Sequence, residues 1–398
     1  MSKTYQFPEN FDWGTATSAH QVEGNNVNSD WWEWENQHDI EGELRREPSG
    51  KACDFYHRYE EDLDLCKKLN NNAIRLSIEW ARIEPDEGKF STKELDHYKK
   101  VLAAARKRGL TTYVTLHHFT NPRWFLKKGG WLNPKSAYYF SRYAEKCAEV
   151  LDKEIDKYLT INEPQVYTMM SYVLGRWPPN KKNLVKSLFV QINMVRAHKK
   201  AYTVIKNLSG SPVGIVKNIM WHEPSKNSWN PLDKLFTKIL YWLNCDFILW
   251  PIRNHLDIIG VNYYFTNRVK NLRQDNPDAY ISDLKWWINP EGLIKVLENL
   301  KRYNLPLYIT ENGIADSKDS HRKDFIRTML ISCFKAIENK VPLKGYFHWS
   351  LVDNFEWHHG YWPRFGLVEI DRDNNLKRNP RPSFKYYAQI CKDGKLVV

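Results

Sequence analysis

Two glutamates stand in matching sequence contexts and could carry out acid–base chemistry together. Glu163 ends the stretch "KYLTINE" and Glu311 lies in "LYITENG"; each is next to an asparagine and close to a turn-forming residue. A lone glutamate at the end of a strand is usually a solvated turn residue. The repeated context favours instead one shared pocket, in which one carboxyl group donates a proton while the other attacks or activates water.

Eight short β-prone runs alternate with longer helix-prone segments and would position these side chains. The runs cover residues 11–19, 73–80, 111–119, 157–163, 212–219, 257–264, 306–312 and 344–352. Eight strands alternating with helices over 398 residues predict an α/β fold, the (β/α)₈ TIM barrel, as a single domain over residues 1–398. A doubly wound open sheet is the alternative, but it should show a glycine-rich phosphate loop after its first strand, and residues 14–24 do not form one.

Two of the intervening segments carry sequence signals for the ends of helices. Residues 91–109 open on Ser91 with Glu94 three residues later, which is a capping-box pattern, and they close on Gly109, a natural C-cap. Residues 133–153 begin with Asn-Pro, and proline is tolerated in the first turn of a helix. Both patterns support helices between successive strands, as the barrel requires.

In a barrel of this kind the catalytic groups lie at the carboxyl ends of the strands. Here the predicted strand ends and the residues just past them carry mostly hydrogen-bonding or ring-bearing side chains. They are His20, Gln21, Glu79, Trp80, His117, His118, Asn162, Glu163, Asn262, Tyr264, Glu311, Asn312, Trp349, Glu356 and Trp357. The implied pocket has carboxylates, many donors and acceptors and tryptophan walls, and aromatic rings can stack on the C–H faces of sugars.

Glycoside hydrolysis needs such a pocket. One carboxyl group protonates the leaving oxygen, and another carboxylate attacks the sugar or activates water. The acid must keep its proton near neutral pH, so its pKa must be raised by burial or by a neighbouring negative charge. Glu163 and Glu311 lie on the fourth and seventh predicted strands, from which their side chains could converge across the barrel mouth.

Net charge and cysteine content narrow the class of protein. The 59 basic and 47 acidic residues give a net charge of +12, but the basic residues are scattered, which favours a solvated basic surface and no nucleic-acid partner. The spacing of the cysteines favours free thiols in a reducing compartment and argues against a zinc or other metal site. The cysteines stand at positions 53, 66, 147, 245, 333 and 391, with no CxxC pair.

The apolar segments are too short or too interrupted to span a membrane. Residues 235–252 come nearest, but Lys238, Asn244 and Asp246 interrupt them and Pro251 closes them, so a buried or interface helix is expected there. The N-terminus lacks the apolar segment of a secretory signal. These features predict a cytoplasmic protein without a membrane partner.

At this point the motifs resemble those of one family. From "FPENFDWGTATSAHQVEG" to "RNPRPSFKYYAQI" the chain resembles glycoside hydrolase family 1, the retaining β-glucosidase and β-galactosidase family. "TINEP" and "ITENG" are similar to its two signature glutamate motifs, and "HWSLVDNFEWHHGYWPRFGLVEID" (348–371) is similar to a third, longer one. The three motifs occur in the same order as in the family, and the resemblance covers essentially the whole chain.

The resemblance implies a role for each matching residue. Glu163 is similar to the general acid/base and Glu311 to the nucleophile of the family. The implied substrate contacts are Gln21, His118, Asn162, Tyr264, Trp349, Glu356, Trp357 and Phe365. Arg75, Asn262 and Tyr264 are similar to the residues that support the nucleophile, and a cation and a phenol there would hold it ionised and oriented. No metal or organic cofactor is implied.

The resemblance further implies an exo-acting, retaining β-glycosidase that removes terminal β-D-glucosyl residues, with β-galactosidase and β-fucosidase side activity. β-Glucosides and short β-linked oligosaccharides are the expected small-molecule substrates. A 6-phospho-β-glucosidase, a β-mannosidase and a non-catalytic sugar-binding barrel are the rivals. Glu356 would repel a phosphate, and non-catalytic relatives lose one or both glutamates, whereas both are present here.

One region departs from the family pattern. Residues 219–257 are fewer than the family usually has between the corresponding strands. Loop material at the outer end of the pocket is therefore expected to be missing. The apolar helix around residues 235–250 is expected to pack against another subunit, as in a homo-oligomer, or to cover the flank of the barrel.

Overall fold

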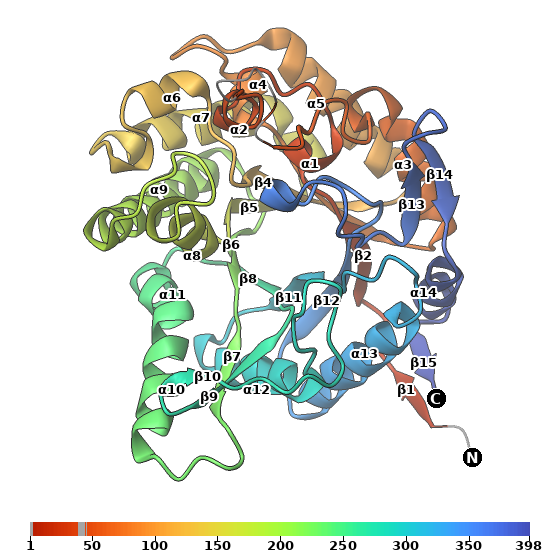
Figure 1. The fold of residues 1–398 in the computed structure, drawn as a ribbon. Coiled ribbons are helices and arrows are strands. Elements are labelled where there is room, and N and C mark those ends of the chain that lie inside the picture. Colours follow the sequence, from red (N-terminus) through yellow and green to blue (C-terminus); the bar gives the residue numbers. More distant parts are fainter. Residues whose placement is uncertain (1–2, 39–43, 45) are drawn as a thin grey trace.

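The computed structural model describes residues 3–38, 44 and 46–398, and its centre is a closed ring of parallel strands with helices outside it (Figure 1). Around the ring the strands are β2 (Asp12–Ala16), β3 (Ala73–Ser77), β4 (Thr111–His117), β5 (Lys157–Asn162), β6 (Val213–Asn218), β8 (Ile258–Asn262), β11 (Leu307–Asn312) and β12 (Leu343–Trp349), which pairs back to β2. Each of the eight predicted runs supplies one barrel strand. The (β/α)₈ barrel is therefore confirmed, and the open sheet is excluded.

Helices and short extra strands surround this ring. The helices are α1 (Ala19–Val22), α2 (Asp30–Glu35), α3 (Phe55–Lys68), α4 (Trp80–Ile83), α5 (Thr92–Lys107), α6 (Arg123–Lys127), α7 (Ser136–Leu151), α8 (Pro164–Thr168), α9 (Leu184–Leu208), α10 (Pro231–Asn244), α11 (Asp246–Ile252), α12 (Pro290–Leu300), α13 (Arg322–Glu338) and α14 (Pro382–Asp393). Outside the barrel lie β1 (Thr4–Gln6) with β15 (Lys395–Val397), β7 (Trp221–Pro224) with β9 (Thr266–Lys270) and β10 (Arg273–Gln274), and β13 (Val368–Asp371) with β14 (Lys377–Pro380). The pairing of β1 with β15 brings the two ends of the chain together (Figure 1).

The starts of α5 and α7 can be compared with those predicted from the sequence. The Ser91 side chain accepts a hydrogen bond from the backbone N–H of Glu94 at 3.3 Å, so the serine half of the expected capping box of α5 is confirmed. The other half does not form, because the Glu94 carboxylate accepts from the Tyr56 hydroxyl and the Ser91 N–H donates to the carbonyl of Ile83. α7 instead begins at Ser136, after the Asn-Pro pair rather than on it. The reason is local: the Asn133 side chain accepts from the Lys135 N–H at 2.8 Å, which makes Asn-Pro a turn before the helix.

Below its mouth the barrel is a packed core rather than a pore. Tyr113, Leu159, Val216, Tyr308 and Phe347 fill its interior and are all buried. The rings of Tyr113 and Phe347 lie edge to face with centroids 4.7 Å apart. This packed layer fills the barrel below the polar side chains at the carboxyl ends of the strands.

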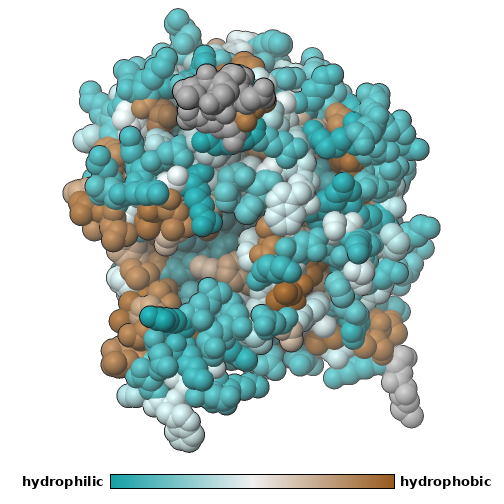
Figure 2. Space-filling view, viewed as in Figure 1, coloured by the Kyte–Doolittle hydropathy of each residue, from teal (hydrophilic) through white to brown (hydrophobic). Residues whose placement is uncertain are grey.

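The apolar segment 235–252 is divided between α10 and α11, which meet at Cys245. Tyr241, Ile248, Leu249 and Ile252 face inward and are buried, so the segment does cover part of the flank. The outward side chains are 46–57% exposed, namely Leu232, Leu235, Ile239, Trp242, Leu243 and Trp250. Figure 2 shows hydrophobic side chains gathered along the edge of the molecule where these helices lie. Of the two expectations for this segment, a buried helix or an interface helix, a wholly buried helix is therefore wrong. The six outward side chains are called the α10–α11 face below.

Within the described parts of the chain, no helix is both long and apolar enough to cross a membrane.

Candidate active site

Glu311 ends β11 and is held by a cation and a phenol. One carboxylate oxygen, Oε1, pairs with Nη1 of Arg75, which rises from β3 and is fully buried. The other, Oε2, accepts from the Tyr264 hydroxyl at 2.6 Å. Burial and the charge of Glu311 raise the pKa of Tyr264 well above its ordinary value, so this phenol stays protonated and donates. These two partners fix the orientation of the Glu311 carboxylate.

The residues after Glu311 explain why the motif continues Asn-Gly. Asn312 turns into the wall, where its side chain donates to the carbonyl of Tyr263 and accepts from the Tyr346 hydroxyl. Gly313 lies against the next strand: a Cβ there would be 1.8 Å from the carbonyl oxygen of Trp349. Only glycine permits that approach, and the approach sets Trp349 beside the end of β11.

Glu163 follows β5 in a different environment. Its backbone has φ +44°, a left-handed conformation that turns the chain sharply into α8. Its Oε1 accepts from Asn262 Nδ2 at 2.7 Å and from Asn218 Nδ2 at 3.2 Å. Burial, and then the charge of Glu311, raise the pKa of Glu163 to about 8. Glu163 therefore keeps a proton at neutral pH, which suits an acid.

Asn162 links the surroundings of the two glutamates. Its Oδ1 accepts from Arg75 Nη2 at 2.7 Å and from Asn262 Nδ2 at 3.2 Å. Its Nδ2 lies 3.1 Å from Nε2 of His118. The network joins β3, β4, β5 and β8, so each strand end restrains its neighbours.

Three aromatic rings and an amide form a second side of the mouth. The ring of His118 lies nearly parallel to those of Trp357 and Trp349, with centroids 5.9 and 6.2 Å away. Burial, and then the charge of Arg75, lower the pKa of His118 well below its ordinary value, so the ring is neutral. Its Nδ1 has no hydrogen-bond partner among the described residues, which leaves it free for a ligand. Gln21 Nε2 donates to the carbonyl of Phe355 at 2.8 Å.

Glu356 and Phe365 complete the predicted set. Glu356 Oε2 lies 3.5 Å from Gln21 Nε2, and burial, followed by the charges of Glu311 and Glu163, raises its pKa to about 8. Phe365 packs near Tyr264, with ring centroids 6.2 Å apart. The residues predicted from the family motifs are thus gathered at one end of the barrel.

Some predicted strand-end residues point elsewhere. Glu79 accepts from the Thr120 hydroxyl, Trp80 stacks on Tyr143, and His117 contacts Asn121, all in the helical layer. His20 pairs with Glu35. His117 and His118 stand at the end of β4, where adjacent residues face opposite sides of the sheet, so only His118 enters the mouth. Glu79 and Trp80 lie beyond the end of β3, at the start of α4, and His20 lies in α1.

Two neighbours of the site escaped the sequence reasoning. Asn218, which donates to Glu163, ends β6, and the strand-end argument applied to residues 212–219 would have found it. Trp286, whose ring centroid lies 5.5 Å from that of Tyr264, belongs to the connection between β10 and α12, outside every predicted strand end.

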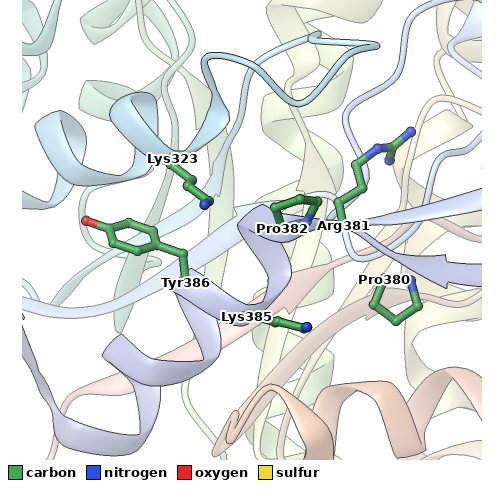
Figure 3. A pocket seen from close by; sticks show the side chains of 6 residues that line it. All are labelled: Lys323, Pro380, Arg381, Pro382, Lys385 and Tyr386. Atoms are coloured by element: carbon green, nitrogen blue, oxygen red, sulfur yellow. The ribbon is translucent and has the colours of Figure 1, made fainter.

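A surface hollow between α13 and α14 lies on the outer side of the ring, not at the mouth (Figure 3). Its lining side chains are basic, aromatic or proline: Lys323, Pro380, Arg381, Pro382, Lys385 and Tyr386. None is a carboxylate, so this hollow lacks the pair of carboxyl groups that glycoside hydrolysis needs. Nowhere in residues 3–38, 44 and 46–398 do three or more His, Cys, Asp or Glu side chains gather in a way that could hold a metal ion.

The chain belongs to Glycosyl hydrolase family 1, whose sequence model matches residues 3–249 and 244–395. It is 31% identical to beta-glucosidase A of Thermotoga maritima, covering 98% of this chain and 99% of that protein. It is 30% identical to the 1,4-beta-D-glucan glucohydrolase of Thermotoga neapolitana, with the same coverage. The solved structure of the beta-glycosidase from Pyrococcus horikoshii superposes with a TM-score of 0.92 at 37% identity, covering 99% of this chain and 96% of that one. The chain is therefore a β-glycosidase of the β-glucosidase type, as expected from its motifs.

The family match also bears on the shortened region. Its two segments meet at residues 244–249, where α10 passes into α11. The alignment with the Thermotoga maritima protein spans 442 positions, more than the 398 residues of this chain. The relative thus carries residues without a counterpart here, and the shortening of residues 219–257 stays a prediction.

Proposed function

We propose that this chain is a retaining exo-β-glycosidase that removes terminal β-D-glucosyl residues, with Glu311 as nucleophile and Glu163 as general acid/base. One observation carries the proposal, namely the contrast between the two carboxyl groups. Glu311 is paired with the Arg75 guanidinium and a phenol, whereas Glu163 is held by amides alone. Environments that separate two carboxyl groups in this way mark the acid and the nucleophile.

The reaction then has two steps. Glu311 attacks the anomeric carbon and forms a covalent glycosyl-enzyme, while Glu163 gives its proton to the departing oxygen. In the second step Glu163, now a carboxylate, takes a proton from water; the oxygen attacks the anomeric carbon and releases Glu311. Two inversions return the β-configuration. The carboxyl groups are expected about 5–5.5 Å apart, as in other retaining enzymes.

Exo-action is supported by the groups available for one terminal sugar. Gln21, His118 and Glu356 offer donors and acceptors to its hydroxyls, and Trp349 offers a flat ring to its C–H face. Asn162 is placed for the hydroxyl next to the anomeric carbon. The scheme requires no metal or organic cofactor. We also propose a cytoplasmic location, supported by cysteines that are all buried free thiols.

A substrate panel tests this proposal. Nitrophenyl β-D-glycosides of the gluco, galacto, fuco, manno and 6-phospho-gluco series are compared under one set of conditions. We expect hydrolysis of the glucoside well above that of its 6-phosphate, because the carboxyl group of Glu356 offers no cation to pair with a buried phosphate dianion. NMR of the first-formed sugar should show the β-anomer. A preference for the 6-phosphate or the mannoside, or an α-anomer, would replace this proposal, and no turnover at all would favour a sugar-binding barrel.

We also propose that the chain associates with a second copy through the α10–α11 face. Six large apolar side chains about half exposed on neighbouring helices are more than an isolated surface usually carries. Sedimentation should therefore show a dimer or larger assembly. The double variant Ile239→Glu and Trp242→Glu should be monomeric and active, and the exposed Lys234→Glu on the same helix should leave the assembly intact. A monomeric wild type would contradict the proposal.

A further inference from the structure

The segment that carries Glu356 and Trp357 has an unfavourable backbone. Trp357 has φ +53°, a left-handed conformation that a bulky side chain rarely adopts. The segment bends back on itself, because the N–H of Glu356 donates to the carbonyl of Gly360 at 2.7 Å. A strained conformation of this kind persists only where the surrounding structure holds it. Contacts from outside the segment must therefore keep Glu356 and Trp357 in place.

The ring of Trp357 is surrounded by aromatic side chains from other parts of the chain. Its centroid lies 4.8 Å from that of Trp31 in α2, 5.0 Å from that of Phe119 after β4 and 5.5 Å from that of Trp177. Trp177 stands in the connection between α8 and α9 and is buried. Its ring also contacts those of Phe119 and Trp31, with centroids 4.8 and 5.5 Å away. The four rings therefore form one packed cluster.

Of the two indoles that contact Trp357 in this cluster, Trp177 also donates a hydrogen bond to the strained segment. Its Nε1 donates to Nδ1 of His358 at 3.0 Å. Burial, and then His359 and Arg176, lower the pKa of His358 to about 4, so near pH 7 the ring is neutral and Nδ1 can accept. The indole N–H of Trp31 is fully buried but has no partner among the described residues.

The hydrogen bond joins two loops with different roles in the proposed reaction. Trp177 and His358 are 181 positions apart in the chain. The loop of Trp177 follows α8, which starts directly after the turn at Glu163. Residues 356–358 carry the proposed sugar contacts. The bond therefore ties these contacts to the part of the chain that carries the proposed acid/base.

We propose that Trp177 is a positioning residue for the terminal sugar: its indole N–H and its ring hold residues 356–358 in the conformation that presents Glu356 and Trp357 to the substrate. The inference rests on the substrate contacts of the proposed function. When fewer molecules hold the binding conformation, the apparent affinity falls by the same fraction. Loss of the bond should therefore weaken sugar binding, whereas the chemical steps of the bound substrate should change little.

The variant Trp177→Phe keeps a ring in the cluster and removes the N–H. Nδ1 of His358 then lacks its donor, which favours other conformations of the segment. We expect KM for nitrophenyl β-D-glucoside and the inhibition constant of glucose to rise roughly tenfold. We expect kcat to stay within about threefold of the wild type. Initial rates at several glucose concentrations measure all three constants, and circular dichroism checks the fold.

Trp31→Phe is the matched control. It makes the same change in the same cluster, but the N–H that it removes has no partner among the described residues. Both variants leave a similar space and should lower the melting temperature. Only Trp177→Phe should raise KM and the inhibition constant. An equal rise in both variants would make packing the cause and overturn the role of the hydrogen bond.

A double variant tests the pair of residues. His358→Leu alone should raise KM as Trp177→Phe does, because the same hydrogen bond is lost. Combining the two changes should raise KM no further. Additive effects would overturn the pairing. If Trp177→Phe does not fold, His358→Leu compared with the wild type carries the test.

A variant of Glu356 separates this inference from the proposed function. Glu356→Gln should itself raise the inhibition constant of glucose, because it changes a proposed sugar contact. An unchanged constant in Trp177→Phe, beside a raised one in Glu356→Gln, overturns the role of Trp177 alone. An unchanged constant in Glu356→Gln overturns the proposed sugar contact, and the inference with it.

Discussion

Replacing Glu311 with glycine should lower hydrolysis of nitrophenyl β-D-glucoside by on the order of 10⁴-fold or more, because no other group at the mouth is placed to attack the anomeric carbon. Azide or formate should then restore turnover. Either anion fits the space left by the carboxylate and attacks from the same side, so the product should have the α-configuration. NMR of the glycosyl azide, together with rates at increasing azide, measures both effects.

The fold of this variant should persist. Arg75 loses its carboxylate partner but keeps hydrogen bonds to Thr115, Thr310 and Asn162. Circular dichroism and the melting temperature serve as controls, and wild-type enzyme with azide gives the background. A β-configured azide product from Glu311→Gly would exchange the roles of the two glutamates.

Replacing Glu163 with alanine should instead give a loss that depends on the leaving group. For alkyl or unactivated glycosides, which need a proton, we expect a reduction of about 10²–10⁴-fold. Dinitrophenyl glycosides should still form the glycosyl-enzyme, and azide should then attack it from the opposite side and yield the β-product. An equal loss for all leaving groups would mean that Glu163 is structural.

The pH dependence gives a second test of Glu163. Its pKa is raised to about 8, so in the wild type the protonated form that the first step needs is lost as pH rises through that value. We therefore expect kcat/KM to fall on the basic side near pH 8. In Glu163→Ala with a dinitrophenyl substrate this limb should disappear, since no proton is transferred to the leaving group.

The barrel and most of its mouth follow from local sequence signals. The barrel strands are short runs rich in β-branched and aromatic residues, separated by longer helix-prone segments. The two glutamates could be found because the same context, a glutamate beside an asparagine at the end of a predicted strand, occurs twice. The motif match then added Arg75 and the supporting role of Tyr264; both residues contact Glu311.

Other features depend on tertiary contacts that no local pattern encodes. The break at Cys245 has neither glycine nor proline; instead the Asn244 side chain accepts from the Met220 N–H and donates to the Asn218 carbonyl. That contact fixes the end of α10 against β6. Likewise, the sequence around Lys217 predicts only an ordinary strand. Its hydrogen bond to the side chain of Gln165 depends on the folded structure.

The network around the glutamates determines when activity appears during folding. Arg75 and Glu311 are 236 positions apart in the chain, and Arg75 and Asn162 are 87 apart. Contacts between such distant segments form late, because the entropy of closing long loops must be overcome first. A chain in which the helices have formed but the barrel has not closed does not yet hold Glu311 near Glu163. The return of hydrolysis during refolding should therefore report when β3, β5 and β11 have come together, and a fragment that ends before β11 lacks Glu311 and should regain no hydrolysis.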